Sequence, residues 1–324
     1  MEKKSGTLLP YLLLLGMLSA APLLHAAGSA TPSQHSDMGQ PAPTQAEEAL
    51  LQELDFAVDA AHKALQAGPQ AIPVAGQATL NLPKGYGFIP AHEARNLLNA
   101  MGNTPSAQTQ GMIVPKGEHD ETADWFMVVS YENAGYIKDD DAKNWNADEL
   151  LSSIRAGTEA GNEERQARGI PAMEVVGWIE KPQYNASARQ LVWSIESRDK
   201  GQPADMVNGI NYNTLALGRE GYISMNLVTD VDAVESLKPT AKSLLADLDF
   251  NTGKRYSDFN ADTDKVAEYG LAALVAGVAA KKLGLLAVLS AFLIKFWKLG
   301  AIVLFGGGGF LRKIFWRKGA DANL

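Results

Sequence analysis

The chain has 324 residues, no cysteine and a formal net charge of −8. Without cysteine it has no disulfide, thiol nucleophile or cysteine-ligated metal. The charge is uneven: residues 28–264 carry 18 Lys and Arg against 34 Asp and Glu, whereas residues 265–324 carry 9 against 2. An acidic body repels phosphate backbones, which argues against nucleic acid as a partner. The basic C-terminal part is typical of contact with a membrane surface.

The first 27 residues have the three parts of a secretory signal peptide. Lys3 and Lys4 precede an apolar run over residues 8–18, and small residues follow up to Ala27. The alternative is an uncleaved N-terminal anchor, and either version would export the rest of the chain. Residues 28–45 are rich in Pro, Ser and Gln and predict a disordered linker.

Residues 46–262 have the pattern of an extracytoplasmic α+β domain. Apolar residues at helical spacing predict four helices, at 46–66, 91–102, 148–168 and 234–248. Alternating residues predict a hairpin at 78–90 and strands at 124–132, 173–184, 188–198 and 211–228. Asn146 is the predicted N-cap of the third helix. The expected fold class is therefore α+β, an antiparallel sheet with helices packed on one face, followed by a C-terminal membrane helix or helices.

Residues 263–311 predict membrane-anchoring helices. A helix from about Thr263 would carry a stripe of small residues, which allows close packing against a second helix. The stripe consists of Gly270, Ala273, Gly277, Ala280 and Gly284. The apolar run at 283–311 is long enough to span a bilayer. It contains Lys295 and Lys298, which can snorkel or turn inward.

Four basic residues, Arg312, Lys313, Arg317 and Lys318, follow the apolar run. Under the positive-inside rule they predict a basic cytoplasmic tail at residues 312–324, which would leave the acidic domain outside the cell membrane. The alternative is a pair of helices that lie in the membrane interface. Either arrangement makes the lipid bilayer a partner, and the number of spans stays open.

Several stretches of the chain resemble one bacterial family, the domain of unknown function 2167. They are "LNLPKGYGFIPAHEA", "WFMVVSYENAGYIKDDDAKNWNADELLSSIRAGTEAGN", "VVGWIEKPQYN", "NYNTLALGREGYISMNL" and "GKRYSDFNADTDKVAEYGLAALVAG". The likeness covers about residues 75–300, and the stretches occur in the same order. It implies a bacterial envelope protein with a signal sequence and C-terminal membrane helices. Together with the predicted topology, this gives the bacterial inner membrane as the expected location, with the main domain in the periplasm. The resemblance implies no catalytic residue.

The stretch "SDFNADTDK" places oxygen ligands at alternate positions, namely Asp258, Asn260, Asp262 and Asp264. A Ca²⁺ loop uses this spacing because alternate side chains can fold around one ion. However, Thr263 stands where such a loop needs Gly, and Tyr269 stands where it needs Glu. The alternative is an acidic start to the following helix.

A second acidic run, Asp139–Asp141, is a weaker candidate for a cation site, and a solvated loop is the alternative reading. His119, between Glu118 and Asp120, could act as a base or be simply hydrated. The chain has no HExxH or GxSxG motif, so no catalytic residue and no cofactor is predicted.

Aromatic residues recur in the predicted strands and could line a binding groove, although core packing is their usual role. They are Trp125, Tyr131, Tyr136, Trp145, Trp178, Tyr184, Trp193 and Tyr212. The stretches Tyr184-Asn185 and Asn211-Tyr212-Asn213 are the expected exposed contacts, on the assumption that they flank turns.

Three functions are compatible with these observations. The favoured one is a non-enzymatic binding or scaffold module of the envelope, with a second copy or a membrane protein as its partner. The second is an envelope hydrolase that uses carboxylates outside any known motif. The third is an accessory subunit of a transport or stress system, in which Lys295 and Lys298 pair with acids in another membrane protein.

Overall fold

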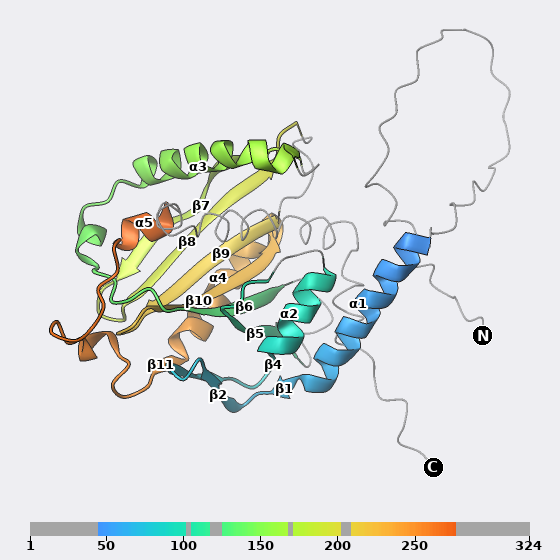
Figure 1. Cartoon of the computed structure of the whole chain (residues 1–324), viewed down its shortest axis with the longest axis horizontal. Coiled ribbons are helices and arrows are strands. Elements are labelled where there is room, and N and C mark those ends of the chain that lie inside the picture. The colour runs from blue at the N-terminus through green and yellow to red at the C-terminus, as the bar shows by residue number, and fades with distance from the viewer. Residues whose placement is uncertain (1–44, 102–104, 117–124, 168–170, 202–208, 277–324) are drawn as a thin grey trace, which may run out of the picture.

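The computed structural model describes residues 45–101, 105–116, 125–167, 171–201 and 209–276. These residues form an α+β fold in which a large antiparallel sheet packs against a small one and several helices (Figure 1). The described helices are α1 (Gln45–Ala64), α2 (Ala91–Ala100), α3 (Ala147–Ala167), α4 (Val231–Ala246) and α5 (Leu271–Val275). The first four confirm the predicted helices to within a few residues.

The larger sheet has eight strands within the described residues, in the order β1-β4-β5-β6-β10-β9-β8-β7. Their bounds are β1 (Gln66–Ala67), β4 (Tyr86–Pro90), β5 (Thr109–Pro115), β6 (Phe126–Glu132), β7 (Met173–Asn185), β8 (Gln190–Asp199), β9 (Gly209–Leu217) and β10 (Tyr222–Asp230). The strands β7 to β10 form the predicted meander. The strand β10 also pairs with β6, which joins the meander to the first half of the chain.

The smaller sheet consists of β2 (Gln70–Val74), β3 (Ala78–Leu82) and β11 (Leu248–Phe250), in the order β11-β3-β2. The hairpin predicted at residues 78–90 is therefore wrong: β3 pairs with β2 and β11, whereas β4 pairs with β1 and β5. Between the two strands lie Pro83, which has no N–H to donate, and Gly85, with φ of 93°. These residues redirect the chain from one sheet to the other.

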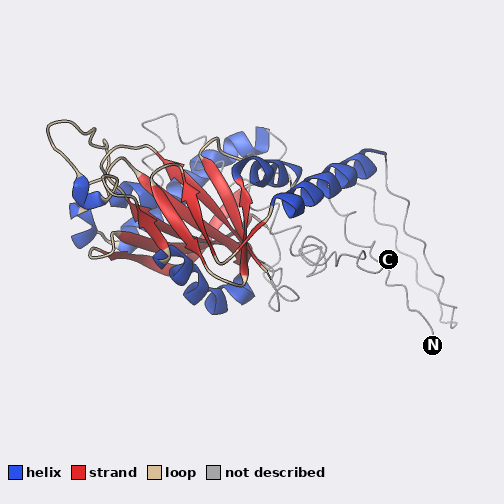
Figure 2. Cartoon of the chain, turned by 90° about the horizontal axis from the view of Figure 1, so that it is seen from below, coloured by secondary structure: helices blue, strands red, loops and turns tan. Residues whose placement is uncertain are grey.

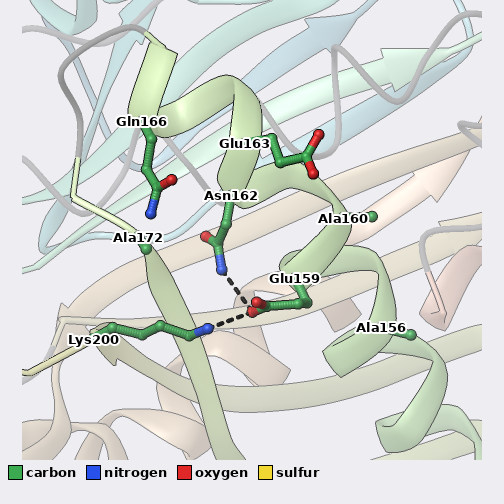
Figure 3. A pocket seen from close by; sticks show the side chains of 8 residues that line it. All are labelled: Ala156, Glu159, Ala160, Asn162, Glu163, Gln166, Ala172 and Lys200. Carbon is green, nitrogen blue, oxygen red and sulfur yellow. Dashed lines mark hydrogen bonds and ion pairs between the residues drawn. The ribbon is translucent and has the colours of Figure 1, made fainter.

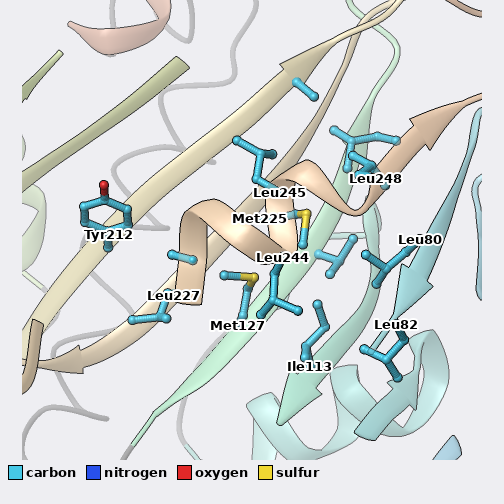
Figure 4. Close-up of a cluster of buried hydrophobic side chains, with 14 of the residues drawn as sticks. Leu80, Leu82, Ile113, Met127, Tyr212, Met225, Leu227, Leu244, Leu245 and Leu248 are labelled. Atoms are coloured by element: carbon cyan, nitrogen blue, oxygen red, sulfur yellow. The ribbon is translucent and has the colours of Figure 1, made fainter. Parts of the chain in front are cut away.

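One face of the large sheet packs against the small sheet and α4. Strand residues such as Ile113, Met127 and Met225 meet Leu80 of β3 and Leu244 of α4 in one buried cluster (Figure 4). Because successive residues of a strand point to opposite faces, this cluster takes every second residue of β5, β6 and β10.

The opposite face carries two separate apolar clusters. One joins α1 and α2 to Met112 of β5 and Val128 of β6. The other joins α3 and α5 to Leu191 of β8 and Leu215 of β9. Helices therefore lie on both sides of the sheet (Figures 1 and 2), and the expectation of helices on one face was wrong. The reason is that strands such as β6 bury apolar residues on both faces.

The predicted helix at Thr263 begins only at Leu271 and is five residues long in the described part of the chain. Before it, Val266 forms an isolated parallel bridge with Tyr136. Leu271 is buried in the same cluster as α3, and Ala273 packs against that cluster. None of the helices in the described residues is long and apolar enough to cross a membrane.

Several predicted features lie outside the described residues and stay predictions. These are the signal peptide, most of the linker, His119, most of the membrane segment with Gly277, Ala280, Gly284, Lys295 and Lys298, and the tail with Arg312, Lys313, Arg317 and Lys318.

Candidate functional site

The predicted Ca²⁺ loop takes part in hydrogen bonds within the protein, some of them local and two of them from a distant arginine. Asp264 accepts two hydrogen bonds from the Arg219 guanidinium, at 2.6 and 2.8 Å, and these hold the pKa of its carboxyl well below the usual range. Asp258 accepts the backbone N–H of Arg255, and Asn260 accepts that of Asp262. In the described part of the chain, no three acidic or histidine side chains gather around a common point.

Two residues of the acidic run, Asp139 and Asp141, accept hydrogen bonds from residues far away in the chain. Asp139 accepts hydrogen bonds from Tyr184, Tyr256 and Arg189. Burial alone would raise the pKa of Asp139, but the hydrogen bond from Tyr184 and the charge of Arg189 outweigh it and lower that pKa. The carboxylate of Asp141 accepts the first two N–H groups of α5, those of Leu271 and Ala272.

The predicted aromatic residues mostly pack in the core. Tyr212 is fully buried and donates its hydroxyl to Glu180 at 2.8 Å, and Trp178 donates its indole N–H to the Ala147 carbonyl at 3.1 Å. Tyr184 is tied to Asp139 at 2.7 Å. Trp193 also packs against the apolar cluster of α3 and α5, and it borders the polar residues described below.

A pocket of about 520 Å³ lies beside the C-terminal half of α3 (Figure 3). Its central polar groups are already paired: Glu159 accepts bonds from Lys200 at 2.6 Å and from Asn162 at 2.8 Å. Asn162 also exchanges two hydrogen bonds with the backbone of Met173. The hydrogen bonds that line this pocket therefore hold α3 against Met173 of β7 and against Lys200, the residue that follows β8.

On the face of the large sheet that packs against α1, α2, α3 and α5, the gap between the two apolar clusters is polar. Here five side chains from three adjacent strands share one face, and we call them the polar strip. They are Ser130 of β6, Ser224 and Asn226 of β10, and Asn211 and Asn213 of β9. In the strand register, Ser224 lies opposite Ser130, and Asn226 lies opposite Asn213. The face is fixed by Val128 and Val228, which belong to the α1–α2 cluster.

Most hydrogen-bonding capacity of the polar strip is unused. Asn226 donates its amide to Asn211 Oδ1 at 2.9 Å, and Asn213 donates to the Asn211 carbonyl at 3.2 Å. The Oγ of Ser130 and the Oδ1 of Asn226 are buried and have no hydrogen-bond partner among the described residues. A buried polar atom without a partner costs about 1–3 kcal/mol, so each such atom in a native fold needs an explanation.

Two further side chains border the polar strip on the same face. Trp193 of β8 lies opposite Asn213 and is half-buried. Glu132 lies two residues after Ser130, opposite Tyr222, and is also half-buried. No hydrogen bond or ion pair holds Glu132 within the described structure, and burial raises the pKa of its carboxyl from 4.5 to about 7.

This arrangement can bind more readily than it can catalyse. A carboxyl with a pKa near neutrality can transfer protons. However, the strip and its borders offer only one carboxyl among the described residues, whereas hydrolysis by carboxylates uses a pair. The other groups are amides, hydroxyls and aromatic rings, which recognise polar ligands through hydrogen bonds.

Two residues of the strip, Asn211 and Asn213, were predicted as contacts from the sequence, but for the wrong reason. Asn211 and Asn213 were expected to flank a turn, but they lie within β9 and are half-buried on the sheet face, while Tyr212 points into the opposite core. The detectable signal was the alternation of asparagine with buried residues in "NYNTLAL". Ser130, Ser224 and Asn226 were not identified, because their approach depends on the pairing of β6 with β10.

Comparison with known proteins identifies the family. A family model described as "Protein of unknown function (DUF2167)" matches residues 66–305. The chain belongs to this family. The match confirms the resemblance noted from the sequence, and it assigns no activity to the DUF2167 protein.

Among solved structures, the DUF2167 protein is similar to the PsbP protein of the cyanobacterium Synechocystis sp. PCC 6803. The two share 12% sequence identity with a TM-score of 0.34, over 58% of this chain and 93% of that one. It is also similar to the Ran-binding protein Mog1p of Saccharomyces cerevisiae, with 13% identity and a TM-score of 0.32, over 60% of this chain and 100% of that one. No curated protein sequence matches the chain.

Proposed function

We propose that this DUF2167 protein is a non-enzymatic binding module of the bacterial envelope, and that the polar strip is its ligand-binding surface. The observation that carries the proposal is the unused hydrogen-bonding capacity of Ser130 and Asn226 in the middle of the sheet. Both side chains are more than nine-tenths buried, at 6% and 2% exposure. A ligand that bonded to them would offset a cost that the fold otherwise bears.

The position of the strip supports a binding role. Apolar residues fill the same sheet face on both sides of the strip, where α1 and α2 cover one end and α3 and α5 the other. Apolar residues at the strip positions would join these two clusters into one core and stabilise the fold. The sequence instead places serine and asparagine there, which favours recognition over packing.

The cellular setting of the proposal comes from the sequence. The signal peptide would export the domain, and the apolar C-terminal segment would hold it at the inner membrane, with the domain in the periplasm. A binding module fixed in this way would meet ligands of the envelope.

The experiment is a thermal-shift measurement on the full-length protein purified in detergent. The probes are the sugar, peptide and lipid fractions of a bacterial envelope digest. A ligand at a hundredfold excess over its Kd stabilises a native protein by about 2.7 kcal/mol. We expect one fraction to raise the melting temperature of the wild type.

The matched variants are Asn213→Ala in the strip and Asn99→Ala on the exposed side of α2. We expect the Asn99→Ala protein to respond as the wild type does, and the Asn213→Ala protein to respond less. No response to any fraction, or equal responses of both variants, would contradict the proposal.

A further inference from the structure

We infer that the ligand of the polar strip is a neutral sugar chain. This inference rests on the proposed function and adds the chemical class of the ligand. It follows from three features of the strip: its mixture of donors and acceptors, its lack of a cationic side chain, and the aromatic ring of Trp193 beside it.

The unused groups of the strip demand a ligand that both donates and accepts hydrogen bonds. The Oδ1 of Asn226 can only accept, whereas the Oγ of Ser130 can do both. The amide nitrogen of Asn211 can only donate, and the Oδ1 of Asn211 already accepts from Asn226. A sugar hydroxyl donates and accepts at once, so neighbouring hydroxyls can satisfy neighbouring donors and acceptors.

The charge of the domain argues against an anionic ligand. Residues 28–264 carry 34 acidic against 18 basic residues, and the strip itself contains only serine and asparagine. Anion sites need arginine, lysine or clustered backbone N–H groups, which these side chains do not supply. Phosphorylated lipids and other anionic ligands are therefore poor candidates.

Trp193 supplies the apolar contact that a sugar ring requires. Its side chain shares the face of the strip, lies opposite Asn213 and packs against the apolar cluster of α3 and α5. It is only half-buried, so part of it reaches the surface. The indole N–H of Trp193 has no hydrogen-bond partner within the described structure, whereas that of Trp178 donates to a carbonyl. An aromatic ring with one apolar body and one free donor fits a ligand with C–H faces and hydroxyl edges.

A peptide fits the strip less well. Extended peptides bind by pairing with the edge of a sheet, and helical or proline-rich peptides bind in apolar grooves. The strip lies on three central strands, β6, β10 and β9, which are paired on both sides. Their backbone groups are thus used, and the side chains offered are polar.

The test is a glycan array of neutral and anionic oligosaccharides, probed with the full-length protein in detergent, followed by calorimetric titration of the strongest hit. We expect binding to neutral chains only. The variants are Trp193→Leu, which removes the ring, Trp193→Phe, which keeps one, and Asn213→Ala, which leaves the ring in place.

We expect Trp193→Leu and Asn213→Ala each to weaken binding about tenfold, the loss that corresponds to about 1.4 kcal/mol. Trp193→Phe should recover most of the affinity, and Asn99→Ala should keep all of it. Circular dichroism of each variant shows whether the fold is retained.

The outcomes separate the two proposals. If the peptide or lipid fraction stabilises the protein through Asn213 and no neutral glycan binds, the sugar inference is overturned and the binding function stands. If a neutral glycan binds equally well to the wild type and to folded Asn213→Ala and Trp193→Leu proteins, the sugar site lies elsewhere and the inference also fails. If no fraction and no glycan binds, both proposals fail.

Discussion

Two buried serines of the large sheet differ in hydrogen bonding, and this difference can be measured through the free energy of unfolding of their alanine variants. Ser194 is fully buried and donates its hydroxyl to the Asn211 carbonyl at 2.9 Å. Ser130 is buried, and its hydroxyl has no hydrogen-bond partner among the described residues. We expect Ser130→Ala to leave the free energy of unfolding unchanged or to raise it by about 1 kcal/mol, because it removes an unpaired polar atom.

Ser194→Ala is the matched control, and we expect it to lower the free energy of unfolding by about 1 kcal/mol because a hydrogen bond is lost. Urea denaturation of the three proteins provides the comparison. An equal loss of stability in both variants would show that Ser130 has a structural partner and is not reserved for a ligand.

Glu132 makes stability depend on pH near neutrality. Burial raises the pKa of its carboxyl to about 7, so the native state holds a proton that the unfolded chain releases near pH 4.5. The contribution of the protonated Glu132 carboxyl to the free energy of unfolding is therefore greatest at low pH and is lost as the pH rises through about 7. Tyr222 lies opposite Glu132 in the strand register, and burial and, to a lesser extent, the charge of Glu132 raise the pKa values of Tyr222, Tyr131 and Tyr269.

Burial also raises the pKa of Asp199 to about 6, although the charge of Arg165 acts to lower it. Asp199 therefore adds a second loss of stability with rising pH, which ends at a lower pH than that of Glu132. We expect Glu132→Gln to flatten the decline in stability between about pH 4.5 and pH 7 and to be more stable than the wild type at pH 8. Urea denaturation across this range is the measurement. Parallel curves for the two proteins would refute the assignment.

Single residues were predictable from the sequence where their partners are close in the chain. Asn146 does cap α3: its Oδ1 accepts the backbone N–H of Asp148 at 2.9 Å. The role of Asp264 was not predictable, because its partner Arg219 lies 45 residues earlier. An alternation of acidic residues looks the same whether they bind an ion or a distant guanidinium.

The last helix of the described chain, α5, is held by Asp141, which lies in a short 3-10 helix (Asp140–Lys143) far away in the sequence. Asp141 accepts its first two N–H groups, at 3.1 and 2.9 Å, and a Cβ added at Gly270 would meet the same carboxylate. We expect Asp141→Ala to loosen α5 at a cost of about 1 kcal/mol, as for a lost helix cap. Limited proteolysis near residues 265–276 should then be faster.

Gly270→Ala should have the same effect, since its new methyl group would displace the carboxylate. Asp140→Ala is the control, because Asp140 is exposed and its one ion pair within the described residues is with Lys143 at 3.4 Å. Proteolysis at equal rates in the Asp141 and Asp140 variants would contradict this role. The close approach of the Asp141 carboxylate gives Gly270 a packing role within the domain. The predicted role of Gly270 in membrane packing is untested.

Elements with strong local patterns were well predicted, and their partners were not. The helices α1 to α4 and the meander β7–β10 follow from spacing and turn residues alone. The pairing of β3 was not predicted, because the alternation in "ATLNL" indicates a strand but not the strands with which it pairs. Its pairing with β11 joins residues about 170 positions apart, as in the hydrogen bond of Thr79 to Asn251.

At the scale of the whole molecule, helices cover both faces of the large sheet. On one of these faces, the polar strip lies between the two apolar clusters. The polar strip was invisible in the sequence, because Ser130 and Ser224 become neighbours only when β6 pairs with β10. Asparagine and serine in a strand usually indicate a solvent-facing position. Only the two apolar clusters on either side show that these residues interrupt a core.

The membrane arrangement is a separate expectation at this scale. We expect a reporter that is active only in the cytoplasm to be active when fused after Leu324, and the untagged chain to resist carbonate extraction. An external C-terminus would instead mean an even number of crossings or an interfacial attachment. Replacing Lys295 and Lys298 by leucine leaves this test unchanged and serves as its control for insertion.

The most direct test of the binding function is photo-crosslinking in living cells. A benzophenone amino acid replaces Asn213 in the strip or, in a control strain, Asn99 on α2, and intact-mass spectrometry detects what becomes attached on irradiation. If the strip is a binding surface, position 213 will acquire a discrete adduct that position 99 does not. If position 213 stays as free of adducts as position 99, the polar strip is not the place where this protein binds a ligand.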